Sequence, residues 1–162
     1  MRSRRVCSST RRRASVRTDS TVFNTLAGGL GVDIVHIPAF AKQLQAPGTR
    51  FRSVFSATEL RTARRRAGAT GTLNHHLAAR WAGKEAFIKA WSSALLGQPP
   101  AIEPDRVDFS EIQVLSDAYG RPYIHLTGTI ASAFGTSRPA AVVSLSHDGD
   151  YAIAICQLKG ES

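Results

Sequence analysis

The stretch Trp81-Ala82-Gly83-Lys84-Glu85-Ala86-Phe87-Ile88-Lys89-Ala90 decides the fold of this chain. It holds good helix formers, one Gly and no Pro, which predicts the interior of a helix. The flanking sequence extends that helix from about residue 74 to residue 93. Glu85 and Lys89 stand one turn apart on the same face, with the acid before the base. Such a stripe usually faces water, and the alternative is that it lines a site.

Shorter elements surround this helix. Ser56 and Glu59 have the spacing of a capping box and predict a second helix that runs to about residue 67. Asp148-Gly149 predicts the turn of a hairpin. Together these patterns predict an α+β domain over residues 26–162, with a largely antiparallel sheet packed against one long central helix. The other expected segments are strands at 27–37, 107–115, 123–126, 140–146 and 151–158, and short helices at 38–45 and 127–134.

The charge of +9 is concentrated at the N-terminus of the 162-residue chain. Residues 1–18 carry seven arginines and no acid, and without them 14 basic residues face 12 acidic ones. We expect residues 1–25 to be a disordered Arg/Ser-rich tail. Its composition resembles an organellar transit peptide, and it could also be a phosphate-binding arm or an extension without function. An extension or disordered tail without a targeting role is favoured because nothing else indicates an organelle.

The apolar runs and the cysteines of the sequence exclude some classes of protein. No apolar run approaches the roughly 20 residues of a membrane span, so we expect no membrane partner. Cys7 and Cys156 have neither metal-ligand spacing nor a disulfide framework, which is typical of a protein of the reducing cytoplasm.

A few polar residues could carry chemistry. Asp33 sits inside an apolar run, so its carboxylate must be paired, bound to a metal or placed at a strand end. His147 ends a strand just before the Asp-Gly turn, where a turn residue is commoner than a catalytic one. The helix after the capping box carries four arginines, which form either a solvated face or a docking surface for an acidic partner or phosphates, namely Arg61, Arg64, Arg65 and Arg66.

Taken together, the motifs resemble those of holo-acyl-carrier-protein synthases, the small trimeric class of 4′-phosphopantetheinyl transferases. The resemblance covers about residues 28–158. It rests on Gly31-Val32-Asp33-Ile34, Phe55-Ser56-x-x-Glu59-Leu60, Arg80-Trp81-Ala82-x-Lys84-Glu85-Ala86-x-x-Lys89-Ala90, Gly120-Arg121-Pro122 and Val143-Ser144-Leu145-Ser146-His147. It implies transfer of the 4′-phosphopantetheine arm of coenzyme A to a serine of apo acyl carrier protein, in fatty acid biosynthesis. Adenosine 3′,5′-bisphosphate and the holo-carrier would be released.

The same resemblance implies roles for individual residues. Asp33 and Glu85 would hold Mg²⁺, whose preference for hard oxygen ligands would explain the acid at position 33. Glu85, Lys89 or a water on the metal would take the serine proton. The expected coenzyme A contacts are Arg80, Lys84, Ser146 and His147.

The resemblance also implies a homotrimer with its site between adjacent protomers. The carrier protein, or the carrier domain of a large fatty acid synthase, would dock by charge on the first helix. That helix holds only Lys42, so the expected docking residues are Lys42, Arg50 and Arg52.

Two competing functions stay open from the sequence. One keeps the fold without catalysis, as a module that binds a carrier protein or a nucleotide. The other is a basic RNA-binding protein that uses its Arg-rich tail, whose affinity would depend steeply on salt. Removing residues 1–25 separates these alternatives. A transferase should keep its activity without the tail, whereas an RNA-binding protein that uses the tail should lose its affinity for RNA.

Overall fold

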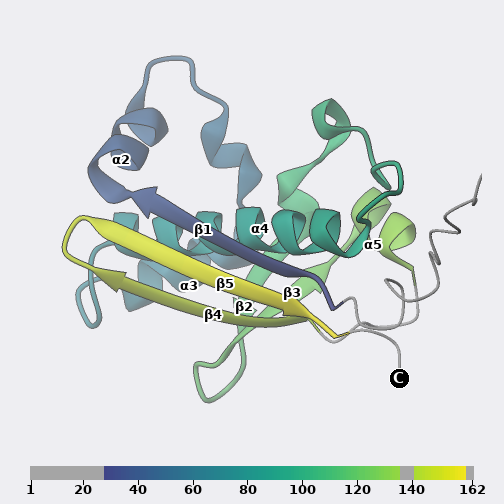
Figure 1. Ribbon diagram of the computed structural model, residues 1–162. Helices are drawn as coiled ribbons and strands as arrows, with labels where there is room; N and C mark the ends of the chain where they lie inside the picture. The colour runs from purple at the N-terminus through teal and green to yellow at the C-terminus, as the bar shows by residue number, and fades with distance from the viewer. Residues whose placement is uncertain (1–27, 136–140, 160–162) are drawn as a thin grey trace, which may run out of the picture.

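The structure, a computed structural model, describes residues 28–135 and 141–159. The expected tail, residues 1–25, lies outside them. A long helix, two sheets and several short helices make up the described chain (Figure 1). In chain order the elements are β1 (Leu30–His36), α2 (Ile37–Gln45), η1 (Phe51–Val54), α3 (Ala57–Arg66), α4 (Leu73–Ala94), η2 (Pro104–Arg106), η3 (Phe109–Glu111), β2 (Ile112–Ser116), β3 (Pro122–Leu126), α5 (Gly128–Phe134), β4 (Ala141–Asp148) and β5 (Tyr151–Leu158).

All strand pairs are antiparallel, as expected. The larger sheet has the order β1-β5-β4, and β2 pairs with β3 in a separate two-stranded sheet. Strands β1 and β4 are therefore the two edges of the larger sheet, with β5 between them (Figure 1). The expected hairpin closes with Asp148 opposite Tyr151. The α+β prediction is confirmed.

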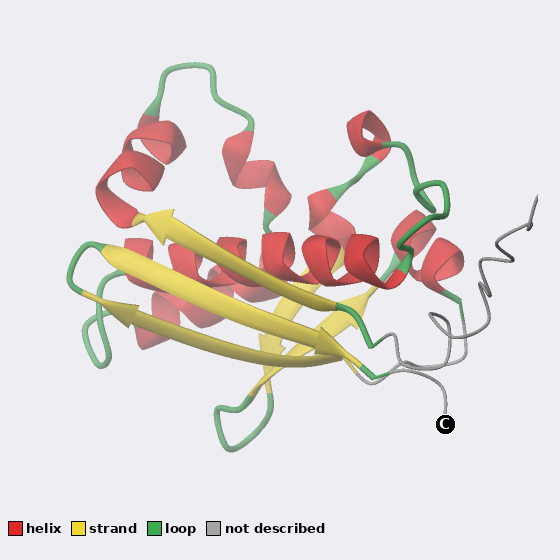
Figure 2. Cartoon of the chain, viewed as in Figure 1, coloured by secondary structure: helices red, strands yellow, loops and turns green. Residues whose placement is uncertain are grey.

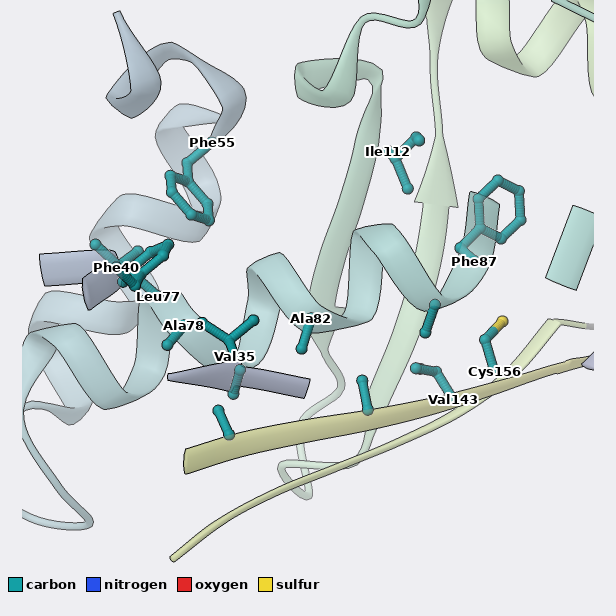
Figure 3. Close-up of a cluster of buried hydrophobic side chains, with 14 of the residues drawn as sticks. Val35, Phe40, Phe55, Leu77, Ala78, Ala82, Phe87, Ile112, Val143 and Cys156 are labelled. Atoms are coloured by element: carbon teal, nitrogen blue, oxygen red, sulfur yellow. The ribbon is translucent and has the colours of Figure 1, made fainter. Parts of the chain in front are cut away.

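Helix α4 lies between the two sheets, and Figure 2 shows the two-stranded sheet crossing behind it. It contacts β1, β5 and β4 on one side and β2 on another, so it is buried along much of its length. Four alanines spaced four residues apart form a small-residue stripe along the helix, and all are buried: Ala78, Ala82, Ala86 and Ala90. Larger side chains fill the space at either end of the helix, among them Phe40 and Phe87 (Figure 3).

Strand β1 approaches the backbone of α4 closely because Gly31 on its inner face and Gly29 just before it have no side chain. A Cβ atom at Gly31 would overlap the carbonyl oxygen of Ala86, and one at Gly29 would overlap that of Ala90. Only glycine allows this separation. The close approach brings the inward-facing Asp33 of β1 up to the last turns of α4.

The region before β2 differs from the expected strand at 107–115. Residues 104–106 and 109–111 form short 3₁₀ turns, and the strand begins only at Ile112. The carboxylate of Asp108 accepts a hydrogen bond from the Ser110 backbone N–H at 2.8 Å and so stabilises the second turn. Local capping of this kind competes with strand pairing.

The capping box of α3 is confirmed. Ser56 accepts a hydrogen bond from the Glu59 N–H, and the Glu59 carboxylate accepts one from the Ser56 N–H at 2.8 Å. Across the described residues, no helix combines the length and the apolar character that a membrane crossing needs.

Candidate active site

Asp33 and Lys89 form an ion pair between β1 and α4. Lys89 Nζ lies 2.7 Å from Asp33 Oδ1. The Asp33 side chain is 14% exposed, whereas that of Lys89 is 51% exposed. Lys89 thus pairs with Asp33, and the ion pair with Glu85 that the helical spacing offers is not formed. Asp33, the acid inside the apolar run of β1, therefore has its ionic partner on α4.

Glu85 joins this pair from the same face of α4. Burial and the negative charge of Asp33 raise the pKa of Glu85, and the positive charge of Lys89 opposes the shift. Two carboxylates and one ammonium therefore share the place where β1 crosses α4. We refer to Asp33, Glu85 and Lys89 as the carboxylate site.

A second polar cluster lies at the opposite edge of the sheet, around a pocket of about 280 Å³. Three of the expected coenzyme A contacts, Arg80, Ser146 and His147, line it. We call it the cationic pocket. Its other lining residues are Arg66, Thr70, His76, Ala79, Val114, Ser116, Gly120, Pro122 and Leu145.

Arg80 is the most buried cation of the cationic pocket. It is 5% exposed, and burial lowers its pKa. One guanidinium nitrogen donates to the His76 carbonyl oxygen at 2.9 Å, while its buried Nε has no hydrogen-bond partner among the described residues. A buried donor without a partner is costly and is consistent with an anion as its missing partner.

Sequence reasoning missed two members of this pocket, His76 and Arg66. His76 lies one turn before Arg80, so the i, i+4 spacing on α4 was the available signal. Burial lowers the pKa of His76, and its ring lies 6.2 Å from that of His147. Arg66 stood out only as part of the basic run of α3, and nothing in that run indicated that one of its arginines would line a pocket.

Lys84 differs from the expectation. Its side chain is fully buried, and its ammonium donates to Glu59 Oε2 at 2.9 Å and to the carbonyl oxygens of Phe109 (2.9 Å) and Ile112. An ammonium has three donors, and all three are used. Lys84 therefore does not line the cationic pocket. Its hydrogen bonds link α4 to α3 and to the start of β2, and no donor is left for a phosphate.

The expected docking residues are separate from both clusters. Lys42 is exposed on α2, Arg50 directly precedes η1, and Arg52 is exposed within η1. They form no ion pair among the described residues.

Within one chain the carboxylate site and the cationic pocket are not combined. Arg80 and Glu85 are five residues apart on α4, which turns their side chains about 140° from each other around the helix axis. Asp33 lies on the edge strand β1 and His147 on the opposite edge strand β4. The two clusters therefore face different sides of the molecule.

The described residues contain no group of three or more His, Cys, Asp or Glu side chains arranged to hold a metal ion. The carboxylate site offers two acids. That number is too small for an all-protein metal cage but suits an ion that keeps waters and substrate phosphates in its coordination shell.

The cationic pocket has the chemistry to hold phosphate, and the carboxylate site has the chemistry to hold a divalent cation. Residues 29–156 match the 4′-phosphopantetheinyl transferase superfamily, and the chain belongs to that family. A holo-[acyl-carrier-protein] synthase of Corynebacterium glutamicum (strain R) is 49% identical over 131 residues, which are 80% of this chain and 96% of the relative.

Solved structures of acyl carrier protein synthases are also similar to this chain. The ACPS–CoA complex from Chronobacterium ammoniagenes is 50% identical, with a TM-score of 0.76 over 84% of this chain and 99% of that one. The acyl carrier protein synthase of Mycobacterium tuberculosis is 38% identical, with a TM-score of 0.62 over 82% of this chain and 97% of that one.

Proposed function

We propose that this protein transfers the 4′-phosphopantetheine arm of coenzyme A to a serine hydroxyl of an apo acyl carrier protein. A bond forms between the serine oxygen and the phosphorus that bears the arm. The bond from that phosphorus to adenosine 3′,5′-bisphosphate breaks, and the serine proton passes to a base on the enzyme. The observation that carries the proposal is the convergence of Asp33, Glu85 and Lys89 from two separate elements.

The cationic pocket supplies the coenzyme A contacts in this proposal. Arg80, Ser146 and His147 would hold a phosphate, with help from Arg66 and His76. The unpartnered Nε of Arg80 supports this role, because a phosphate oxygen would satisfy it. The relative solved with coenzyme A supports the choice of ligand.

The chemistry of the donor set fits a magnesium ion held by Asp33 and Glu85. Burial and, after it, the charge of Asp33 raise the pKa of Glu85, and a divalent cation between the two carboxylates would relieve their repulsion. Bound there, magnesium would offset negative charge on the phosphate oxygens of coenzyme A. The ammonium of Lys89 neutralises Asp33 in the structure and would be free to contact phosphate when the metal supplies that charge.

Two side chains of the carboxylate site are the candidates for the base that takes the serine proton. The raised pKa of Glu85 makes it a better proton acceptor than an ordinary carboxylate near neutral pH. Lys89, which is half-exposed, is the other candidate, and its ammonium would first have to lose a proton to act as a base. A water on the metal completes the set that the sequence left open.

We further propose a homotrimer in which the carboxylate site of one copy meets the cationic pocket of its neighbour. The separation of the two clusters within one chain supports this arrangement. So does the outer face of the larger sheet, where apolar side chains lie directly opposite one another yet are exposed. Val32 pairs with Ile155 and Ile34 with Ile153, with exposures between 38% and 62%. An exposed apolar patch of this kind is typical of an interface.

The proposed partner is an acyl carrier protein or the carrier domain of a fatty acid synthase, in fatty acid biosynthesis. The free, buried Cys156 supports a reducing cytoplasm as the compartment. The competing function as a binding module without catalysis is disfavoured, because Asp33, Glu85 and Lys89 are all present and close together.

Mass spectrometry of the carrier protein tests the proposed transfer. Apo acyl carrier protein incubated with coenzyme A, magnesium and the enzyme should gain the mass of one phosphopantetheine arm. Asp33→Asn and Glu85→Gln should stop the gain while leaving the circular dichroism spectrum unchanged. Magnesium alone should raise the melting temperature of the wild type but not of Glu85→Gln. A folded wild-type enzyme that adds no mass would refute the function.

A further inference from the structure

The ion pair between Asp33 and Lys89 occupies the place that the proposed function assigns to a divalent cation. Lys89 Nζ donates to Asp33 Oδ1 at 2.7 Å, and Asp33 is one of the two acids proposed to hold the ion. Glu85, the other acid, forms no ion pair among the described residues. Within the carboxylate site, the ammonium of Lys89 is therefore the counter-charge that the two acids share.

Packing directs the Lys89 side chain onto Asp33. A Cβ atom at Gly31 would lie only 3.0 Å from the Cβ atom of Lys89, so the base of the lysine side chain lies against the bare backbone of β1. Gly31 and Asp33 are two residues apart and share one face of the strand. The Lys89 side chain thus begins beside Gly31, and among the described residues its ammonium donates only to Asp33. The pair is built by the close approach of β1 to α4.

A cation that used both carboxylates would have to displace Lys89. Asp33 Oδ1 is already bonded to the ammonium, and a divalent ion at the site would be repelled by a positive charge this close. The Lys89 side chain is half-exposed, so its ammonium can leave Asp33 for water. An ion pair that is partly exposed favours the paired state by roughly fivefold at most. The competition therefore lowers the affinity of the free enzyme for a divalent ion without preventing its binding.

Phosphate is the ligand that would release Asp33. An ammonium forms a charge-assisted hydrogen bond with a phosphate oxygen as well as with a carboxylate. Coenzyme A brings phosphate oxygens to the site in the proposed reaction, and Lys89 can exchange Asp33 for one of them. Asp33 and Glu85 are then left without the ammonium, and this state attracts a divalent cation. Phosphate and cation thus each remove what opposes the other, and such a coupling is reciprocal.

We propose that Lys89 is a resident competitor for the divalent cation, which makes cation binding and coenzyme A binding cooperative. In the free enzyme Lys89 holds Asp33, and the cation binds weakly. In the complex with coenzyme A, Lys89 bonds a phosphate, and Asp33 is open to the cation. This inference rests on the proposed transferase function and its magnesium site, and it adds how the two ligands regulate each other's affinity.

Direct titration of a metal ion without any carrier protein tests the inference. Manganese is the probe, because it prefers the same oxygen ligands as magnesium and its free ion is measured by electron paramagnetic resonance. Lys89→Met should lower the Kd for manganese of the coenzyme A-free enzyme roughly fivefold, since the competing ammonium is gone. The same change should weaken coenzyme A binding in EDTA, because the phosphate loses its ammonium partner.

Three variants serve as controls. Lys89→Arg keeps a cation opposite Asp33 and should bind manganese within about twofold of the wild type. Lys42→Met removes the same charge from an exposed position on α2 and should leave the manganese Kd unchanged. Glu85→Gln combined with Lys89→Met should lose the gain in affinity, because one of the two proposed ligands is missing. Thermal melts establish that each variant is folded.

The coupling is measured by repeating the titration with saturating coenzyme A, corrected for manganese bound by free coenzyme A. The wild-type Kd for manganese should fall when coenzyme A is present. The ratio of the two Kd values should be roughly fivefold smaller in Lys89→Met, because the cation already binds without an ammonium to displace. The NMR signal of the Lys89 side chain in the wild type should shift when coenzyme A is added in EDTA, as expected for an ammonium that exchanges Asp33 for phosphate.

The inference and the proposed function can fail separately. Tighter manganese binding by Lys89→Met supports the inference even if no arm is transferred to a carrier. An enzyme that transfers the arm, but whose Lys89→Met variant binds manganese no more tightly than the wild type, overturns the inference and leaves the function intact. An equal gain in Lys42→Met, or a coupling ratio that is the same in wild type and Lys89→Met, also overturns it.

Discussion

Replacing Lys84 by Met should destabilise the fold without changing how coenzyme A binds. The Lys84 ammonium is fully buried and serves Glu59 and two backbone carbonyls, those of Phe109 and Ile112. The Met side chain fills a similar volume but donates no hydrogen bond. Glu59 would keep only its bonds from the Ser56 N–H (2.8 Å) and the Val114 N–H (3.0 Å), as a buried anion without a counter-charge.

The magnitude follows from what is left unpaired. Removing one partner of a buried ion pair lowers the free energy of unfolding by about 3–5 kcal/mol, because the remaining charge stays buried without a counter-charge. For a domain of this size, that loss corresponds to a fall in melting temperature of about 10–20 °C. Differential scanning calorimetry at one fixed protein concentration measures it. The double variant Glu59→Gln, Lys84→Met should lose less than the sum of the two single variants, because each single change already breaks the same pair.

Lys89→Met is the matched control. Its ion pair with Asp33 is half-exposed on the lysine side, so its loss should cost no more than about 1 kcal/mol. Lys84→Met assayed well below its melting temperature should bind coenzyme A with wild-type affinity. A Lys84→Met protein that melts like the wild type and binds coenzyme A more weakly would show that Lys84 is a phosphate ligand and that its buried position in the structure is wrong.

Three further changes test the carboxylate site and the proposed interface. Burial and Asp33 raise the pKa of Glu85, so the folded state binds the Glu85 proton more tightly than the unfolded state does. The free energy of unfolding should therefore fall as pH rises from about 4.5 through the raised pKa. Glu85→Gln should flatten this fall in urea titrations at several pH values, and an unchanged pH dependence would contradict the coupling. Gly31→Ala places a Cβ atom against the Ala86 carbonyl, so it should lower the free energy of unfolding by about 1–3 kcal/mol in a denaturant titration. It should also weaken transfer, because β1 would move away from α4. A variant as stable as the wild type would refute the close packing. Ile155→Lys on the exposed sheet face should give monomers by light scattering and no transfer, whereas a trimer that persists would place the interface elsewhere.

Much of the fold follows from local patterns in the sequence. The run of helix formers predicts α4 to within a residue at each end, and the Ser56–Glu59 spacing predicts the start of α3. The Asp148-Gly149 turn predicts the β4–β5 hairpin. These features depend on contacts within a few residues, which a single sequence records.

Features that depend on the tertiary fold could not be predicted in the same way. Glu59 is legible as a capping residue, but its second role, as the buried partner of Lys84, requires the packing of α3 against α4. Lys84 itself stands beside Glu85 in a motif that the resemblance assigns to the site, yet adjacent positions on a helix point about 100° apart. The pairing of Lys89 with Asp33 likewise depends on the glycines that let β1 approach α4.

Complementation between two inactive variants tests the central claim most directly, because that claim is a site built from two copies of the chain. One variant, Glu85→Gln, loses the carboxylate site, and the other, Arg80→Ala, loses the cationic pocket. Unfolded together and refolded as a mixture, they should recover about a quarter of wild-type transfer, since one ordered interface in four joins two intact halves. Each variant refolded alone should stay inactive. A mixture as inactive as its components, with trimers formed, would contradict a site shared between neighbouring copies.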